Sequence, residues 1–160
     1  MECYLDIETT GLSPSDGELT VVGLCLDAGP RMQVIQLVEN DISSANLLQA
    51  MTNVETLYTY NGERFDLPFI RAKLGVDLGR SLRHRDLMFD CWRRNLYGGL
   101  KEVERKLGIC RASVGIDGRV AVELWFRYKY FGDQKSLTTL LEYNKEDICN
   151  LKLLRQKLRL

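Results

Sequence analysis

The stretch Cys3-Tyr4-Leu5-Asp6-Ile7-Glu8-Thr9-Thr10-Gly11-Leu12 lies near the start of a chain of 160 residues. Residues 3–8 alternate apolar and polar side chains, which predicts a β-strand. Asp6 and Glu8 are two residues apart, so their carboxylates would share one face, roughly 7 Å apart along the strand. Two acids on an interior strand are costly without a partner, and neither has a basic neighbour, which favours a bound cation. An exposed face at a sheet edge is the alternative.

The rest of the pattern places most strands before most helices. Residues 19–26 and 32–38 would complete three consecutive antiparallel strands, and residues 54–60 would add a fourth. A short strand fits near residues 83–87. Helices are expected from Ser43 or Ser44 to Met51, and over residues 67–74, 89–96, 100–107, 120–130 and 137–158. The length suits one domain over residues 1–160, an α/β domain whose helices pack on the sheet.

Tyr143 and Asp147 are four residues apart and would be neighbours on one face of the last helix. They lie at the edge of an apolar stripe, so they can face the sheet while the stripe packs beneath them. The stripe consists of Leu137, Leu140, Leu141, Ile148 and Leu151. Taken in isolation, the pair would be a partly buried tyrosine beside a solvated aspartate.

Residues 60–70 hold a third acidic position. Asn61-Gly62 after a strand predicts, if read locally, a hairpin. The residues after this pair have helical character, and Asp66 before Leu67-Pro68 fits a helix start with Pro68 in the first turn. Asp66 taken alone would therefore be an N-cap.

Together these elements resemble the DEDD 3′-to-5′ exonuclease family, whose fold is ribonuclease H-like. The first motif spans residues 6–12, the second runs from Asn61-Gly62 to Phe65-Asp66, and the third spans residues 143–147. They occur in order over nearly the whole chain, and Tyr143 stands where the other branch has histidine, which indicates the tyrosine branch (DEDDy). The resemblance implies a ribonuclease H-like fold with a five-stranded mixed sheet, three strands antiparallel and then parallel ones, flanked by helices.

The resemblance also implies an enzyme that hydrolyses phosphodiester bonds of DNA or RNA by a two-metal-ion mechanism. Two Mg²⁺ or Mn²⁺ ions, which prefer oxygen ligands, would be held by Asp6, Glu8, Asp66 and Asp147. Asp6 would bridge both ions, Glu8 and Asp147 would complete one site, and Asp66 would hold the second mainly through waters. Tyr143, with an ordinary pKa of about 10, is a poor base at neutral pH and would orient the attacking water.

Substrate contacts are implied by the same resemblance. The substrate would be a nucleic acid with a free 3′ end, expected to be single-stranded, and its terminal nucleotide would lie against Thr9, Thr10, Leu12, Asn61 and Phe65. A basic stretch with aromatic residues can hold phosphates or stack a base: Trp92, Arg93, Arg94, Tyr97, Lys101, Arg105 and Lys106. For any one of these, an exposed helix face or a core aromatic is the simpler interpretation.

The distribution of charge and the numbers of histidine and cysteine limit the kinds of site that the chain can form. Residues 1–60 contain nine Asp or Glu and one Lys or Arg, whereas residues 61–160 contain 13 Asp or Glu and 21 Lys or Arg. This split can place an acidic centre beside a basic surface suited to a polyanion, although an unevenly charged solvated surface would look the same. One histidine, His84, and five cysteines without a Cys-x-x-Cys pair exclude His-rich and cysteine zinc sites. Any metal must therefore be held by oxygen, and the cysteines are expected to be buried thiols.

The start of the chain lacks the basic residues and long apolar stretch of a signal peptide, and no apolar run is long enough to span a bilayer. We expect a cytoplasmic protein that makes no membrane contact.

Two local matches favour a structural role over a functional one. His84-Arg85-Asp86-Leu87 matches the start of a protein-kinase catalytic loop, but the chain has no Gly-rich phosphate loop and no Asp-Phe-Gly. Asp86 is expected to cap the next helix. The aromatic run at residues 125–131 invites a base-stacking interpretation, yet helical spacing predicts core packing of Leu124, Trp125, Tyr128 and Phe131.

Two other functions share the expected fold. A ribonuclease H-like endonuclease would use similar metal chemistry, because a fold alone does not fix the cleavage mode. A non-catalytic nucleic-acid-binding module is the second alternative. The Tyr-x-x-x-Asp motif argues against the endonuclease, and the complete set of four carboxylates and the tyrosine argues against the binding module.

Overall fold

The computed structural model describes residues 1–29 and 31–160. Five strands of this part of the chain form one sheet in the order β3-β2-β1-β4-β5. They are β1 (Glu2–Thr9), β2 (Leu19–Asp27), β3 (Met32–Val38), β4 (Thr56–Thr59) and β5 (Arg83–Asp86). The first three strands are antiparallel, whereas β4 pairs in parallel with β1 and β5 with β4. The expected mixed five-stranded sheet is confirmed.

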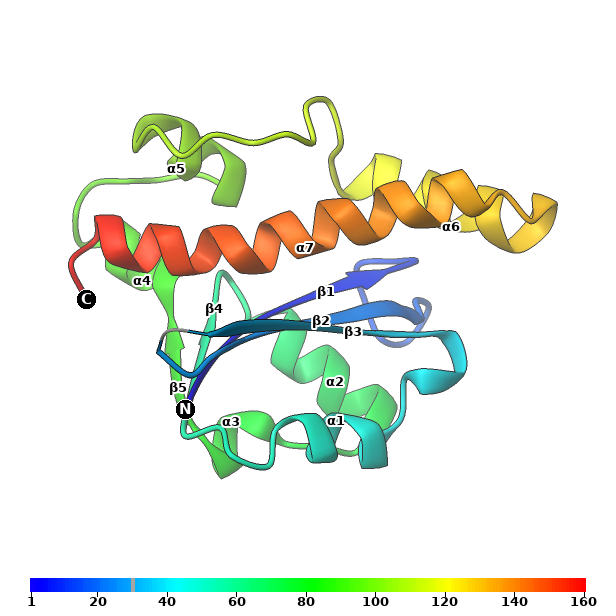
Figure 1. Ribbon diagram of the computed structural model, residues 1–160, viewed down its shortest axis with the longest axis horizontal. Helices are drawn as coiled ribbons and strands as arrows, with labels where there is room; N and C mark the ends of the chain where they lie inside the picture. The colour runs from blue at the N-terminus through cyan, green and yellow to red at the C-terminus, as the bar shows by residue number, and fades with distance from the viewer. Residues whose placement is uncertain (30) are drawn as a thin grey trace.

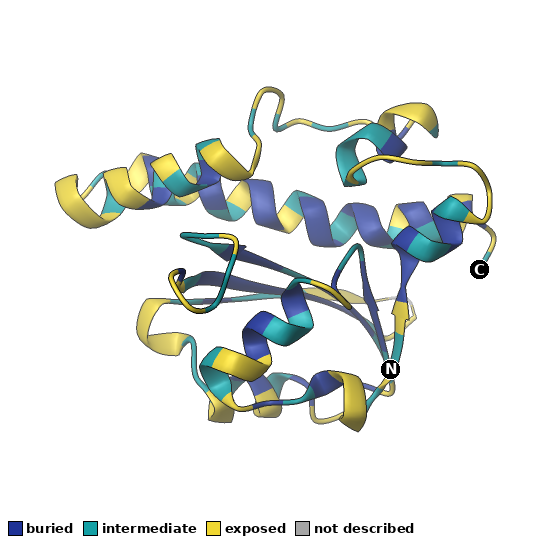
Figure 2. Cartoon of the chain, turned by 180° about the vertical axis from the view of Figure 1, so that it is seen from behind, coloured by how far each residue is buried: buried dark blue, intermediate teal, exposed yellow. Residues whose placement is uncertain are grey.

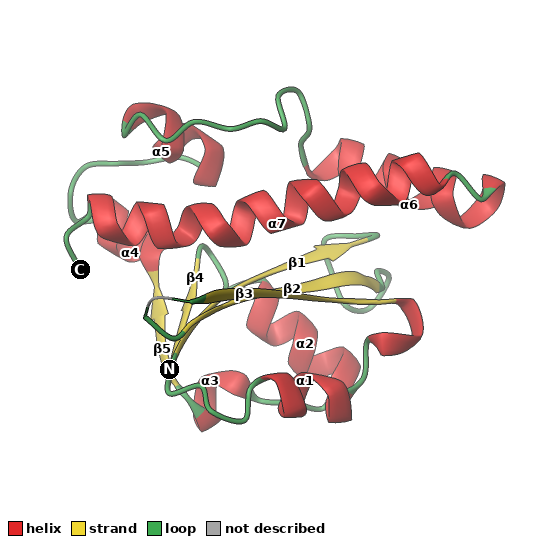
Figure 3. Cartoon of the chain, in the orientation of Figure 1, coloured by secondary structure: helices red, strands yellow, loops and turns green. Residues whose placement is uncertain are grey.

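Helices cover both faces of the sheet (Figure 1). On one face lie α1 (Ser44–Ala50), α2 (Asp66–Leu74) and α3 (Leu78–Ser81). The other face carries α4 (Leu87–Trp92), α5 (Leu100–Lys106), α6 (Gly118–Phe131) and the long α7 (Gln134–Lys157), and a short 3-10 helix spans Glu39–Asp41. Figure 3 shows the resulting order of layers, helices above and below the strands.

The alternation in β1 divides its side chains between two cores. Cys3, Leu5 and Ile7 pack in the core that includes Phe69 and Ile70 of α2. Tyr4 points the other way, into the core that α7 supplies. Because successive strand residues point to opposite faces, Asp6 and Glu8 lie on the Tyr4 side, toward α7. The strand thus carries both acids to the face that α7 covers, and Figure 2 shows the dark stretch of α7 that lies against the sheet.

Helix α7 approaches β2 closely because β2 has a glycine at the contact. Gly23 pairs with Asp6 in the sheet, and a Cβ built on Gly23 would lie 2.1 Å from Asn144 Oδ1. Asn144 is fully buried and donates to the Asp6 carbonyl at 3.3 Å and to Asp6 Oδ2 at 3.2 Å. It also accepts from Gln36 Nε2 at 3.0 Å. The missing side chain of Gly23 therefore leaves the space in which Asn144 holds Asp6.

Gly23→Ala is expected to lower the free energy of unfolding by about 1–3 kcal/mol, because the added methyl group must displace a buried amide. The position of Asp6, which Asn144 holds, should shift as well. Urea unfolding measures the first effect. Gly99→Ala is the matched control, since a Cβ there meets no atom within 4 Å and φ is −71°. Equal stability of both variants would contradict the close-contact explanation.

The two local interpretations of residues 61–66, a hairpin and an N-cap, do not hold in the structure. Asn61-Gly62 forms no hairpin, because β4 lies between two parallel neighbours and the chain leaves it for α2. Asn61 instead adopts a left-handed conformation, φ 62°, and its N–H donates to Asp86 Oδ1 at 2.8 Å. Asp66 is not the N-cap of α2, since Phe65 holds that place, and Asp66 Oδ1 accepts from the N–H of Ile7 at 3.0 Å.

Helix limits differ where capping overrides the periodic pattern. Helix α7 begins at Gln134 because the Asp133 side chain accepts from Ser136 N–H, three residues before the apolar stripe starts. Helix α4 ends at Trp92, well before the expected residue 96, and Asn95 adopts a left-handed conformation, φ 59°. Helix α3 was not predicted, because its four residues are too few for a periodic signal.

The two local matches have structural roles. Asp86 caps α4 as expected, accepting from Met88 N–H at 3.0 Å, and His84 Nε2 shares a hydrogen bond of 2.9 Å with Thr59 Oγ1. In α6, Trp125 is buried, and Leu124 and Tyr128 pack partly buried beside it. Phe131 was expected in the same core but is 84% exposed, because it is the last residue of α6 and the helix ends there at Gly132.

The five cysteines are free thiols, but only part of the burial prediction holds. Cys3, Cys25 and Cys91 are buried, Cys149 is half-buried, and Cys110 is exposed. Cys110 lies in the irregular segment between α5 and α6, where no strand or helix packs its side chain into a core. Of the helices described, none has the length and apolar character to cross a membrane.

Candidate active site

Three acidic side chains from two elements meet on the α7 side of the sheet. Asp6 and Glu8 come from β1, and Asp147 comes from α7. One carboxylate oxygen of each lies within 4.8 Å of the others. Glu8 and Asp147 are buried and Asp6 is partly buried. The spacings Asp-x-Glu and Tyr-x-x-x-Asp therefore do bring the predicted carboxylates together.

Asp66 lies beside this group but outside the tight cluster. It is 3% exposed at the start of α2, and its Oδ1 is bonded to the N–H of Ile7, the residue between Asp6 and Glu8. The second motif is held in place by Asp86, whose two oxygens accept from Asn61 N–H and Glu63 N–H. Strand β1 and helix α7 thus supply the three clustered carboxylates, and the start of α2 places a fourth, that of Asp66, beside them.

The donor set fits a divalent cation. All four groups offer oxygen, which Mg²⁺ and Mn²⁺ prefer. Glu8 Oε1 is buried and has no hydrogen-bond partner among the residues that the structure describes. An unpartnered buried carboxylate oxygen is costly unless a cation or a proton satisfies it. The cluster therefore has both the ligands and an unsatisfied acceptor for a metal ion.

Burial raises the pKa of every carboxyl in this group, and repulsion from other members adds to the shift for Asp6, Glu8 and Asp66. Burial, then repulsion from Asp147, raises the pKa of Glu8 to about 8. Burial raises the pKa of Asp66 to about 7, against the lowering effect of the Ile7 hydrogen bond. The pKa of Asp6 rises well above its usual range through burial and the charges of Asp147, Asp66 and Glu8. Burial also raises the pKa of Asp147, although Arg111 opposes the shift.

Without divalent cations, the protein is expected to lose stability as the pH rises. Carboxyls with a raised folded pKa favour the folded state fully below their unfolded pKa of about 4. This contribution disappears as the pH rises through the folded pKa, about 7 for Asp66 and about 8 for Glu8. The Tm in EDTA should therefore be lower at about pH 8.5 than at about pH 5, and Mn²⁺ should restore it at the higher pH.

Glu8→Gln should make this pH dependence shallower, because it removes one of the titrating groups. A Tm in EDTA that rises steadily over the same pH window would contradict the raised pKa values.

Tyr143 lies one helical turn before Asp147 and is 5% exposed. Its hydroxyl accepts a hydrogen bond from Lys101 Nζ at 2.6 Å, and Nζ lies 4.2 Å from the centre of the tyrosine ring. Burial, with the charges of Asp147 and Glu8, raises the pKa of Tyr143 well above its ordinary value. The phenol is therefore protonated at neutral pH, and its O–H remains a donor.

A cleft of about 460 Å³ opens at these residues. Asp6, Glu8, Asp147 and Tyr143 line it, and Thr9, Thr10, Leu12 and Phe65 of the expected substrate contacts line it too. Leu12 is 91% exposed, as suits a side chain at the mouth. Asn61 does not line the described part of the cleft. The opposite wall comes from α6, through Gly118, Arg119 and Val122, which sequence patterns did not indicate.

The basic stretch between Trp92 and Lys106 makes its contacts within the chain. Two arginines form ion pairs, Arg93 with Asp90 and Arg105 with Glu102. Two other basic residues donate to backbone carbonyls, Arg94 to Leu158 and Lys106 to Tyr97. Trp92 packs edge-on against Phe89. Tyr97 is 55% exposed. None of this stretch lines the described part of the cleft, and Lys101 alone reaches a residue that does. Sequence patterns missed Arg111, which pairs with Asp147.

Comparison with known proteins agrees with this architecture. The RNase H superfamily matches residues 3–159, nearly the whole chain. The chain belongs to the RNase H superfamily. No curated protein sequence shows a significant match to it.

Several solved structures share this RNase H fold. A nuclease in its apo form has a TM-score of 0.66 and 23% identity, over 98% of this chain and 70% of that one. NrnC of Brucella melitensis has a TM-score of 0.63 and 22% identity, over 99% of this chain and 71% of NrnC. The family B DNA polymerase of the hyperthermophilic archaeon Pyrobaculum calidifontis has a TM-score of 0.74 and 17% identity, over 99% of this chain and 24% of the polymerase. The chain thus spans about a quarter of that polymerase. Brucella melitensis NrnC has also been solved bound to pGG and with bound Mg²⁺.

Proposed function

We propose that this protein is a metal-dependent 3′-to-5′ exonuclease of the tyrosine branch of the DEDD family. One observation carries the proposal: Asp6, Glu8 and Asp147 offer oxygens within 4.8 Å of one another in a cleft that Tyr143 also lines. The buried acceptor Glu8 Oε1, which lacks a described partner, supports a cation there. Two proteins with the same fold support the choice of metal and substrate class: one is a nuclease, and the other, NrnC, has been solved with Mg²⁺ and with pGG.

Each residue of the cluster would have a distinct role. Asp6, Glu8 and Asp147 would hold one Mg²⁺ or Mn²⁺ ion, and Asp6 with Asp66 a second. When bound, the two cations would stabilise the charge that develops on the attacking and leaving oxygens of a phosphodiester. Lys101 Nζ occupies one lone pair of the Tyr143 hydroxyl, which leaves its O–H free to orient the attacking water.

The open end of the cleft would receive the 3′-terminal nucleotide. Thr9, Thr10 and Leu12, at and just beyond the end of β1, line the cleft beside the acids, and Phe65 lines it from the second motif. An apolar ring and an exposed leucine at the mouth suit contact with a base. Asn61 does not line the described part of this cleft and could contact the substrate only if the loop before α2 moved. We therefore assign Asn61 a structural role, in which its N–H fixes that loop to Asp86.

Product length and polarity test the proposal. A 5′-labelled single strand, DNA or RNA, with Mn²⁺ should shorten stepwise from its 3′ end and give a ladder of labelled products. A blocked 3′ end should stop the reaction, and EDTA sets the zero. Release of the labelled 5′ nucleotide first would show the opposite polarity and reject the proposal.

A further inference from the structure

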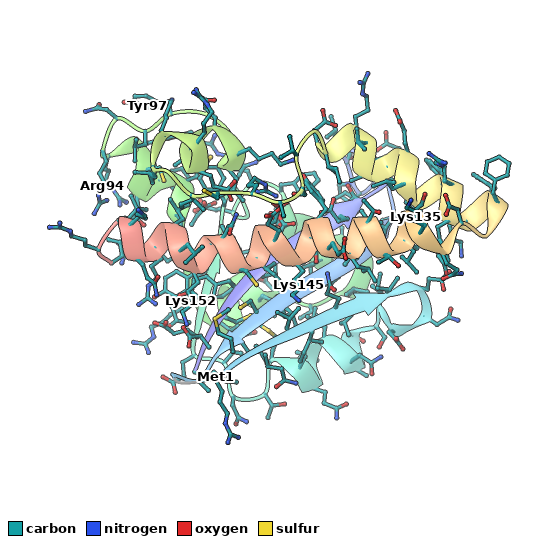
Figure 4. All side chains as sticks on the ribbon, turned by 45° about the horizontal axis from the view of Figure 1, so that its top comes forward. Met1, Arg94, Tyr97, Lys135, Lys145 and Lys152 are labelled. Carbon is teal, nitrogen blue, oxygen red and sulfur yellow. The ribbon has the colours of Figure 1, made fainter. Side chains whose placement is uncertain are left out.

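The segment that joins α5 to α6, residues 107–117, is here called the strap. It runs above α7 in Figure 1, and Figure 4 also shows it running along that helix. Arg111 lies in the strap with its side chain only 11% exposed. Nothing in the proposed function uses this buried arginine, although it contacts one of the clustered carboxylates.

Arg111 joins two helices through its guanidinium group. Nη1 lies 3.0 and 2.7 Å from the two oxygens of Glu104 on α5. Nη2 donates to Asp147 Oδ1 on α7 and lies 3.4 Å from Ser113 Oγ. Glu104 and Asp147 have side chains that are 1% and 8% exposed. The arginine is therefore held on one edge by a buried acid outside the cluster, and its other edge faces Asp147.

The geometry of a guanidinium makes this arrangement directional. Its donors form a rigid planar fork, so the grip of both Glu104 oxygens on Nη1 fixes where Nη2 points. Arg111 Nη2 donates to only one of the two oxygens of Asp147, Oδ1. This hydrogen bond sets the orientation of the carboxylate and leaves Oδ2 available to another partner. Partners of this kind orient metal-binding carboxylates in many sites.

The strap has an anchor that does not depend on Arg111. Glu146 of α7 accepts hydrogen bonds from Ser113 N–H, at 3.0 Å, and from Ala112 N–H. It also accepts from the Ser113 hydroxyl, and it forms an ion pair with Arg111, whose Nε lies 3.6 Å from Glu146 Oε2. The hydrogen bonds of Glu146 to Ala112 and Ser113 therefore attach the strap to α7. The contact between Arg111 and Asp147 is not needed for this attachment.

We propose that Arg111 is a positioning residue that holds the Asp147 carboxylate in the orientation in which it binds a divalent cation. The inference rests on the proposed function, because it requires Asp147 to be a metal ligand. Arg111 would touch neither substrate nor metal, and Glu104 would act only by aligning the guanidinium.

The test measures Mn²⁺ binding by calorimetry, apart from any activity. The variant Arg111→Gln/Glu104→Gln removes the arginine without leaving Glu104 as an unpaired buried charge. It should bind Mn²⁺ about 10–100-fold more weakly than the wild type, the usual cost of losing such a partner. In Glu104→Gln alone, one side-chain oxygen can still accept from Arg111, so the guanidinium is aligned less firmly and the dissociation constant should rise by less than in the double variant. Melting curves in EDTA establish that each protein is folded.

Arg111→Lys provides a second variant should the double variant fail to fold. It keeps the charge but lacks the fork, so it should weaken Mn²⁺ binding in the same direction. Unchanged Mn²⁺ affinity in a folded variant that lacks Arg111 would overturn the inference and leave a packing role. Tighter binding would also overturn it, since Arg111 would then compete with the cation for Asp147. A wild-type protein that binds no Mn²⁺ at all would reject the proposed function itself.

Discussion

Asp6→Asn is expected to reduce hydrolysis by at least about a thousandfold while the fold stays intact. Asp6 lies among Glu8, Asp66 and Asp147, and burial together with the charges of all three raises its pKa. An amide offers one neutral oxygen where the cluster needs an anion, so the cations would bind weakly or wrongly. In EDTA the same change removes one of several repelling acids, so Tm should rise slightly.

The control for Asp6→Asn is Glu142→Gln, which makes the same change of charge at an exposed position of α7. Rates at saturating Mn²⁺, together with melting curves with and without the metal, separate a catalytic loss from an unfolded protein. A variant Asp6→Asn that hydrolyses nucleic acid at the wild-type rate would refute the role of the cluster.

Tyr143→Phe is expected to lower kcat by about ten- to a thousandfold with little change in KM. The ring is 5% exposed and packs in the core with Trp125 and Leu140, so phenylalanine should keep the fold. Only the hydroxyl is lost, and with it the donor proposed to orient the attacking water. Because its pKa is raised, the Tyr143 hydroxyl should not ionise between neutral and mildly alkaline pH. The pH dependence of activity over this range should therefore be the same in the wild type and in Tyr143→Phe.

Tyr130→Phe is the matched control, because Tyr130 lies on α6 with 75% of its surface exposed. Steady-state kinetics of both variants over a range of pH provide the comparison. If Tyr143→Phe and Tyr130→Phe both turn over like the wild type, Tyr143 is a packing residue.

The parts of the fold with a strong local period could be predicted from sequence. The alternation over residues 3–8 predicted a strand with both acids on one face, and β1 has this arrangement. The four-residue spacing of Tyr143 and Asp147 likewise predicted their shared face on α7. Asp66 was different, because no local pattern links it to Asp6, and only the family resemblance suggested its place. In the structure, a hydrogen bond to Ile7 N–H brings it there across the chain.

The remaining features depend on contacts between distant segments. Asn61-Gly62 has the local signature of a hairpin, but the parallel neighbours of β4 leave no place for a returning strand. Arg111 gave no signal, because an isolated arginine in an irregular segment resembles any surface residue. Its partners, Glu104 and Asp147, lie seven residues before and 36 residues after it. The wall that α6 adds to the cleft could not be predicted either, since it requires knowing how α6 lies beside β1.

A comparison of linear and circular single strands tests the central claim most directly. Both strands should have identical sequence and be incubated with equal protein and Mn²⁺, with EDTA as the zero. The chemistry is available at every phosphodiester, so a difference between them reports whether the cleft requires a free end. The proposed exonuclease should degrade the linear strand and leave the circle intact. Cleavage of the circle as fast as the linear strand would contradict the account and favour a ribonuclease H-like endonuclease.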